Sequence, residues 1–274
     1  MIIDSHAHIW TMETSKFPFQ PVLGYTPEKP APVEMLLSEM ERAGVEKAVL
    51  VQPSVYGWDN SYLLSCLDQY PDRLASVCLV DPFDSQAPDL LSSLVSENRI
   101  RGLRLNPIGS PQDNWIHRPD QHRLWEKAFE LKVTICVQIL PHQLDGLAEM
   151  ALRFSGVRIV VDHLAKPSSP SGINTPESLE FLKLAEYPNV FMKLAALAYL
   201  SSQPFPFKDC SPLIQAAVEA FSPSRIVWGS DFPGILKFCS YQQSREYVLE
   251  SLKNLSQGEL DWIFYQTAET LWFQ

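Results

Sequence analysis

The sequence lacks the features that mark exported, membrane-spanning or disulfide-stapled proteins. It has no run of 18 or more uninterrupted apolar residues and no charged leader followed by an apolar stretch, so we expect neither a membrane span nor a signal peptide. The cysteines are odd in number and have no CxxC spacing, which argues against a disulfide framework and a structural zinc cage. We therefore expect free thiols and a cytoplasmic protein. The cysteines are Cys66, Cys78, Cys136, Cys210 and Cys239.

Basic residues are also scarce. Lys and Arg number 22 against 32 Asp and Glu, which gives a formal net charge of -10. Because phosphate backbones are bound by clustered Lys and Arg, and no basic patch is present, nucleic acid is excluded as a partner. We expect a small-molecule substrate, no membrane contact, and a monomer or homodimer.

What the sequence does contain is one pattern repeated along its length. A short β-branched run is followed by a polar or proline-containing break and then by a helical stretch. The runs are nearly continuous in apolar character, as parallel strands covered on both faces are. They occupy residues 1–9, 47–52, 74–80, 100–106, 134–140, 157–161, 190–194 and 225–229.

Eight such units predict a (β/α)8 barrel, an α/β fold whose usual size this chain has. With 274 residues and 46% hydrophobic content, we expect a single domain over residues 1–274. A doubly wound open sheet is the alternative, although no GxGxxG or GKS turn follows any run. Helices are expected at residues 33–43, 60–69, 120–131, 144–154, 176–186, 212–221, 241–254 and 260–273.

Long irregular segments fall where a barrel places its functional loops. Residues 11–32 hold five prolines and three aromatic side chains between the first run and the first helix. This segment is too long and too aromatic for a passive turn, so we expect it to fold over the barrel mouth.

Polar side chains end several of the apolar runs. His6 and His8 lie two residues apart on the first run, so on a strand both point to one face. His163 follows the sixth run, and Asp231 follows the eighth. A single histidine at such a position is more often a structural residue, and a single aspartate is more often a cap. Since the strand ends of a barrel converge on one mouth, the four together predict a site.

Three segments carry a family resemblance: residues 4–8 (DSHAH), 161–167 (VDHLAKP) and 228–233 (WGSDFP). The chain resembles the amidohydrolase superfamily, within its amidohydrolase-related family and the branch of 2-pyrone-4,6-dicarboxylate lactonase and sugar-lactone hydrolases. The resemblance implies a metal-dependent-hydrolase-like barrel. It further implies that His6, His8 and Asp231 line a metal-sized site, with His163 beside them as a catalytic residue.

The resemblance implies two versions of the chemistry. In one, a single divalent metal, zinc before others, lowers the pKa of bound water, and Asp231 moves the proton to the leaving group. In the other no metal is needed, and His6, His8 and His163 donate hydrogen bonds to the carbonyl oxygen. Many superfamily members take a lysine or histidine ligand from strand five. Residues 134–140 (TICVQIL) offer neither, which argues against a bridged two-metal centre.

Substrate recognition is expected from other strand ends. Arg104 could hold a carboxylate with two hydrogen bonds, although a surface ion pair would explain it as well. Tyr56 and Gln138 could bind hydroxyl or carbonyl groups, and Lys193 would add a cation if it faces inward. Since residues 106–110 hold no second arginine, a neutral or singly charged lactone, such as one from a sugar acid, fits better than a dicarboxylate.

Three functions therefore stay open. The first is hydrolysis of a lactone from a sugar acid or small carboxylic acid, with water activated by Asp231. The second is metal-dependent, non-hydrolytic decarboxylation of an unsaturated or aromatic acid, for which the absent strand-five histidine is the discriminating feature. The third is a non-catalytic ligand-binding barrel, which predicts decay of the His-x-His pair or of Ser230 and Asp231; neither has decayed.

Overall fold

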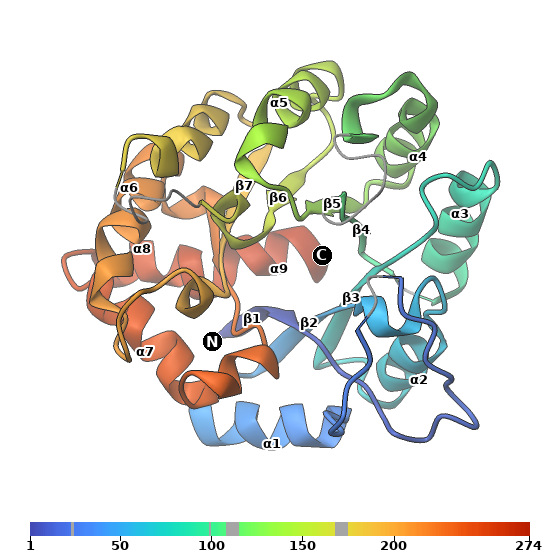
Figure 1. Ribbon diagram of the computed structural model, residues 1–274, viewed down its shortest axis with the longest axis horizontal. Helices are drawn as coiled ribbons and strands as arrows, with labels where there is room; N and C mark the ends of the chain where they lie inside the picture. The colour runs from blue at the N-terminus through green and yellow to red at the C-terminus, as the bar shows by residue number, and fades with distance from the viewer. Residues whose placement is uncertain (23–24, 99, 108–114, 168–174) are drawn as a thin grey trace.

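The computed structural model describes the chain except for residues 23–24, 99, 108–114 and 168–174. Eight strands pair in parallel and in sequence order around a barrel with helices outside it (Figure 1). The predicted (β/α)8 fold is thereby confirmed. The strands are β1 (Ile3–Ala7), β2 (Lys47–Val51), β3 (Leu74–Cys78), β4 (Gly102–Leu105), β5 (Thr134–Val137), β6 (Ile159–Val161), β7 (Val190–Leu194) and β8 (Ile226–Trp228).

The barrel closes between its first and last strands by a short bridge rather than a full ladder. Ala7 pairs in parallel with Phe232, and the His8 amide donates to the Phe232 carbonyl at 2.7 Å. The Asp231 amide donates to the His6 carbonyl at 2.8 Å. The open-sheet alternative is therefore excluded, and this closure brings two of the predicted site segments together.

The helices follow the predicted order. Helix α1 has the predicted bounds and ends at Gly44, whose φ of 66° is the left-handed conformation that glycine adopts at little cost. Helix α3 was not predicted from the sequence. The α-helices are α1 (Val33–Ala43), α2 (Ser61–Gln69), α3 (Ala87–Asn98), α4 (His122–Leu131), α5 (Leu144–Arg153), α6 (Ser211–Phe221), α7 (Tyr241–Ser251), α8 (Gln257–Asp261) and α9 (Thr267–Trp272).

Two predicted helices differ in form. The segment expected as a helix at residues 176–186 is a 3-10 helix, Glu177–Glu186. The expected C-terminal helix is divided into α8, a π-helical turn (Trp262–Gln266) and α9. Among the described residues, no helix combines the length and apolar character needed to cross a bilayer.

The barrel interior is apolar at the end that α9 covers. The Thr134 hydroxyl donates to the Leu271 carbonyl, and Trp272 packs beneath the strands, where Figure 1 shows α9 behind them. Polar chemistry is thereby confined to the opposite end, where the strands finish. Side chains of this interior cluster include Ile3, Val49, Val51, Val77, Cys136, Val160, Val227 and Leu271.

The described part of the loop between β1 and α1 lies against the barrel mouth, as expected. Phe17 packs edge-on to Tyr62 with ring centroids 5.0 Å apart, and the Gln20 amide donates to the Val55 carbonyl. Trp10 and Tyr25 of this loop face the cavity at the mouth. The loop therefore supplies one wall of that cavity.

Candidate active site

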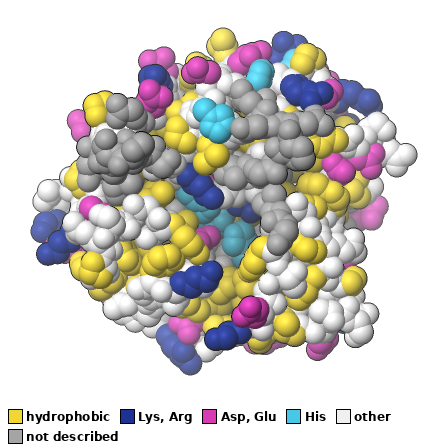
Figure 2. Space-filling view, in the orientation of Figure 1, with side chains coloured by type: hydrophobic (Ala, Val, Ile, Leu, Met, Phe, Trp, Pro, Cys, Tyr) yellow, Lys and Arg dark blue, Asp and Glu magenta, His cyan; other side chains and the backbone are white. Residues whose placement is uncertain are grey.

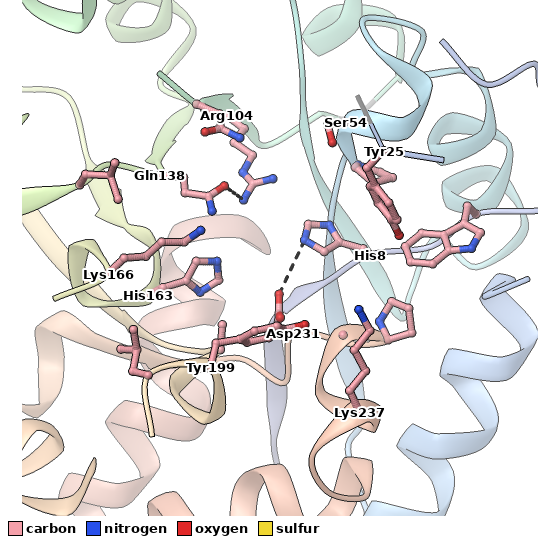
Figure 3. Close-up of a pocket in the computed structure, with 18 residues that line it drawn as sticks. His8, Tyr25, Ser54, Arg104, Gln138, His163, Lys166, Tyr199, Asp231 and Lys237 are labelled. Carbon is pink, nitrogen blue, oxygen red and sulfur yellow. Dashed lines mark hydrogen bonds and ion pairs between the residues drawn. The ribbon is translucent and has the colours of Figure 1, made fainter. Parts of the chain in front are cut away.

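A cavity of about 720 Å³ opens at the carboxyl ends of the strands. In Figure 2 it is a hollow with histidine at its base and Lys or Arg around it. His8, His163 and Asp231 lie together in it, and Figure 3 shows them pointing toward one another. The structure thus brings His8, His163 and Asp231 together at one end of the barrel, as the sequence predicted.

The two histidines of β1 make different contacts. His8 Nδ1 lies 2.7 Å from the Val51 carbonyl oxygen, which only accepts, so Nδ1 carries the proton and Nε2 the lone pair. His6 is fully buried, and its Nδ1 lies 3.1 Å from the Lys193 ammonium, which only donates. His6 Nε2 then carries the proton and faces His8 Nε2 at 3.2 Å.

Asp231 lies beside both histidines. Its Oδ1 is 3.6 Å from His6 Nε2 and 3.8 Å from His8 Nε2. Burial raises the pKa of Asp231 to about 7; Arg104 opposes that rise and Asp162 adds to it. A carboxylate with such a pKa exchanges a proton readily near neutral pH, as a general base must.

His163 reaches the site on a left-handed turn. Residues 163–166 all have positive φ, between 47° and 59°, although none is glycine. The His163 Nδ1 lies 3.1 Å from the Ala195 carbonyl and donates to it, which leaves the Nε2 lone pair free. Burial lowers the pKa of His163 to about 3, and burial likewise lowers the pKa of His8 to about 3. Both rings are therefore neutral acceptors at pH 7.

The donor atoms of His6, His8 and Asp231 suit one divalent ion. Their separations of 3.2, 3.6 and 3.8 Å are close to the roughly 3.4 Å between ligands placed ~2.1 Å from a tetrahedral zinc. His6, His163 and Asp231 also hold ligand atoms within 4.8 Å of one another. Binding requires the His6 proton to lie on Nδ1, which is 3.6 Å from an Asp162 oxygen.

Asp162 is the buried counter-ion beneath the site. Its carboxylate lies 2.8 Å from Lys193 Nζ and 3.3 Å from Arg104 Nε. Burial alone would raise the pKa of Asp162, but Lys193, His6 and Arg104 hold it well below its usual range. Sequence reasoning noted Asp162 only as the neighbour of His163 and gave it no role.

Asp4 is a second carboxylate that sequence reasoning did not single out. It accepts from the His6 amide at 3.0 Å, the Ser230 amide at 2.9 Å, the Ser230 hydroxyl at 2.6 Å and the Tyr241 hydroxyl at 2.8 Å. Asp4 therefore ties the segment that carries His6 to the segment that carries Asp231. The sequence signal for Asp4 was its position two residues before His6 and four before His8, which places it on the same face of the strand.

The four predicted substrate residues divide into two pairs. Arg104 and Gln138 line the cavity, and the Arg104 guanidinium donates to Gln138 Oε1 at 2.7 Å (Figure 3). Lys193 faces inward as supposed, but it is fully buried beneath His6. Tyr56 is buried among aromatic rings, where its hydroxyl accepts from the Thr11 amide at 2.9 Å. Neither of the second pair is part of the described cavity wall.

The cavity also contains residues that sequence reasoning missed. Lys166 and Lys237 add two cations, and Tyr25 and Tyr199 add aromatic walls. Lys166 lies three residues after His163, so its proximity to that motif was a usable signal. Tyr199 and Lys237 end short 3-10 turns, Leu197–Tyr199 and Gly234–Lys237, in the connections that follow β7 and β8, whose course is not readable from side-chain periodicity.

Comparisons with known proteins agree with this architecture. The chain matches the family described as Amidohydrolase over residues 3–274. It is 32% identical over 248 residues to an L-fucono-1,5-lactonase of Burkholderia ambifaria, covering 84% of this chain and 80% of that protein. It is 28% identical over 230 residues to a 4-sulfomuconolactone hydrolase of Rhizobium radiobacter, covering 84% and 75%.

A solved structure gives the same fold. A crystal structure of an amidohydrolase from Burkholderia multivorans with bound zinc superposes with a TM-score of 0.84 at 22% identity, covering 99% of this chain and 98% of that one. At this identity the likeness concerns the barrel alone.

Proposed function

The chain belongs to the amidohydrolase family, and from this premise we propose that it is a hydrolase that opens a cyclic ester with water activated by Asp231. The observation that carries the proposal is the buried Asp231 carboxylate, with a pKa raised by burial to about 7, among three imidazoles at the base of the cavity. Relatives that hydrolyse fuconolactone and sulfomuconolactone support the same reaction class.

Asp231 performs the proton transfers. Its ionised form takes a proton from the attacking water while the water oxygen bonds to the lactone carbonyl carbon. When the ring carbon–oxygen bond breaks, the same proton passes to the leaving alkoxide, and a hydroxy acid is the product. A lactone suits this site because its carbonyl is more electrophilic than an amide carbonyl and its leaving group is better.

The hydrogen bonds of His8 and His163 revise one expectation from the sequence. Each ring donates its Nδ1 proton to a backbone carbonyl, so neither neutral ring has an Nε2 proton for the substrate oxyanion. We infer that His163 orients water by accepting its hydrogen bond, whereas the Nε2 lone pair of His8 faces the Nε2 proton of His6. His6 is the imidazole whose Nε2 carries a proton, because Lys193 donates to its other nitrogen.

A divalent metal fits beside these residues. His6, His8 and Asp231 would hold it, with His163 next to them. Bound there, zinc would lower the pKa of water to about 7 and polarise the carbonyl.

The lactonase proposal is tested with a panel of 1,4- and 1,5-lactones and a pH indicator. We expect the purified protein to acidify at least one lactone solution, and Asp231→Asn to lose roughly two to four orders of magnitude in kcat. Equal rates for the two proteins on every compound, or no rate on any, would overturn the proposal.

Metal content decides between the two versions of the chemistry. Protein purified without added zinc is assayed for bound metal by mass spectrometry and for lactonase activity. Full activity with less than about a tenth of an equivalent bound excludes the metal version, since a required ion occupies every active molecule. Activity that appears only with added zinc supports it.

Decarboxylation remains the second candidate and has a distinct readout, the release of carbon dioxide. Strand β5 and the residue after it present Cys136 and Gln138 rather than a histidine ligand, which favours hydrolysis.

We also place the reaction in a reducing, cytoplasmic setting, because all five cysteines are unpaired.

A further inference from the structure

The cavity wall has the opposite charge to the chain as a whole. The chain carries a formal net charge of -10. The described residues that line the cavity include three cations, Arg104, Lys166 and Lys237, and one carboxylate, Asp231. Beneath them Lys193 and Asp162 form an ion pair at 2.8 Å and offset each other. An acidic protein that gathers cations at one cavity attracts anions there.

Arg104 is held with part of its guanidinium toward the cavity. Its Nε lies 3.3 Å from Asp162, and its Nη2 donates to Gln138 at 2.7 Å. These contacts fix the plane of the group, although the side chain is only 5% exposed. A guanidinium oriented in this way presents its remaining N–H groups to a planar acceptor, and carboxylate is the acceptor that matches it.

Lys166 lies on the same side of the cavity as Arg104, next to His163 (Figure 3). Within the described chain, no carboxylate pairs with it in a salt bridge. Burial and the nearby Arg104 cation lower the pKa of Lys166, so these surroundings disfavour its charge. An anion bound there would relieve that penalty.

The backbone that carries Lys166 is itself strained. Residues 163–166 form consecutive left-handed residues, a conformation that costs roughly 1 kcal/mol or more for each non-glycine residue. Leu164 and Ala165 of this turn are buried, while His163 and Lys166 face the cavity. The turn therefore delivers one reactive side chain and one cation to the same wall.

We propose that the lactone bound here carries a carboxylate, that Arg104 and Lys166 bind this group, and that Lys166 determines the preference for it. The inference rests on the lactonase function proposed above and deepens it. Lys237 lies on the other side of His8 and Asp231 in Figure 3 and is exposed. It adds to the attraction of anions to the cavity but does not bind the carboxylate. A lactone with one carboxylate lies within the sequence-based expectation of a neutral or singly charged substrate. That expectation rested on one cation, Arg104, and did not count the two cavity lysines.

Matched lactones test the proposal. γ-Valerolactone and 5-oxotetrahydrofuran-2-carboxylate differ by methyl against carboxylate on the same ring carbon, and δ-hexalactone and 6-oxotetrahydropyran-2-carboxylate are the six-membered pair. We expect kcat/KM at least about tenfold higher for the carboxylates at low salt, with KM rising as salt screens the attraction. Each compound is assayed with and without zinc.

Lys166→Met should lower kcat/KM at least about tenfold on the carboxylates and less than about twofold on the methyl lactones. Lys166→Arg, which keeps the charge, should retain the preference. The control is Lys253→Met, which removes an equal charge from an exposed site just after α7, where Lys253 pairs with Glu250. Because circular dichroism checks folding and the methyl lactones report the intact catalytic groups, a misfolded variant is recognised.

The outcomes separate the two proposals. If methyl lactones are opened as fast as carboxylates, or Lys166→Met slows both alike while Lys253→Met slows neither, the carboxylate inference is overturned and the lactonase function stands. If wild-type protein opens neither member of either pair and no other lactone of the panel, the function and the inference fail together. A selective loss with Lys166→Met and retention with Lys166→Arg support the inference.

Discussion

At the scale of single residues, the site depends on which atoms hold protons. Val51 and Ala195 present carbonyls that take the Nδ1 protons of His8 and His163, and the Lys193 ammonium turns Nδ1 of His6 into an acceptor. Three imidazoles of the same type thereby acquire different roles. Asp231 differs again, because burial raises its pKa to about 7 and leaves it half ionised near neutral pH.

The rate of lactone opening should follow this ionisation. Since only the carboxylate form of Asp231 accepts a proton, kcat/KM should rise with pH, reach half its maximum near pH 7 and level off above it. The measurement is a pH–rate profile from pH 5 to 9, corrected for spontaneous hydrolysis. A rate that is flat over this range, or that falls with pH, would contradict the assignment of Asp231 as base.

At the scale of elements, the junction of β1 with β8 positions the reactive groups. Asp4 on β1 accepts hydrogen bonds from Ser230, two residues after β8, and the backbone of Gly229 lies against His6. A Cβ at Gly229 would lie 2.6 Å from the His6 Cβ and 2.9 Å from the His6 amide nitrogen. Since backbone atoms cannot give way as a flexible side chain does, this contact needs glycine.

Gly229→Ala should therefore destabilise the protein and displace His6. We expect a loss of about 1–3 kcal/mol in the free energy of unfolding, the usual cost of overpacking, together with a loss of lactonase activity. Urea denaturation and the lactone assay measure the two effects. The matched control is Gly258→Ala in α8, where a Cβ meets nothing within 4 Å, so stability should hold or rise slightly. Equal behaviour of the two variants would refute this account of the junction.

At the scale of the whole molecule, the barrel keeps apolar packing and charge at opposite ends. Trp272 and Leu271 close one end over an apolar interior, and the other end holds Asp231 and Asp162 out of water. Asp162 has Lys193 and Arg104 as partners, whereas the pKa of Asp231 is raised by burial. The ionised Asp231 carboxylate thus destabilises the folded state at the place where the chemistry occurs.

The stability of the protein should show this stored energy. A pKa raised from 3.8 to about 7 means that Asp231 contributes stability that is fully present below pH 4 and is lost as pH rises through 7. Asp231→Asn should thus be more stable than wild type, with the difference growing by about 2.6 kcal/mol between pH 5 and pH 8. Urea denaturation at both values measures it, with the exposed Asp72→Asn as control. A difference that shrinks with rising pH would contradict the assignment.

Much of the fold could be predicted from local sequence signals. The predicted bounds of α1 match the structure because apolar spacing and Gly44 are local features. Helix α3 was missed although its first turn contains Pro88 and Asp89, residues typical of that position. The π-helical turn at Trp262–Gln266 could not be predicted, since an apolar period does not distinguish it from an α-helix.

The sequence by itself determined the order of strands and helices and the placement of His6, His8, His163 and Asp231 at strand ends, because side-chain periodicity is local. Only the tertiary structure decided the proton on each imidazole and the pKa of Asp231. These properties depend on contacts between residues far apart in the chain and on exclusion from water. The same holds for the carboxylate preference that we infer from Lys166, because burial and a strained turn bring that cation beside Arg104.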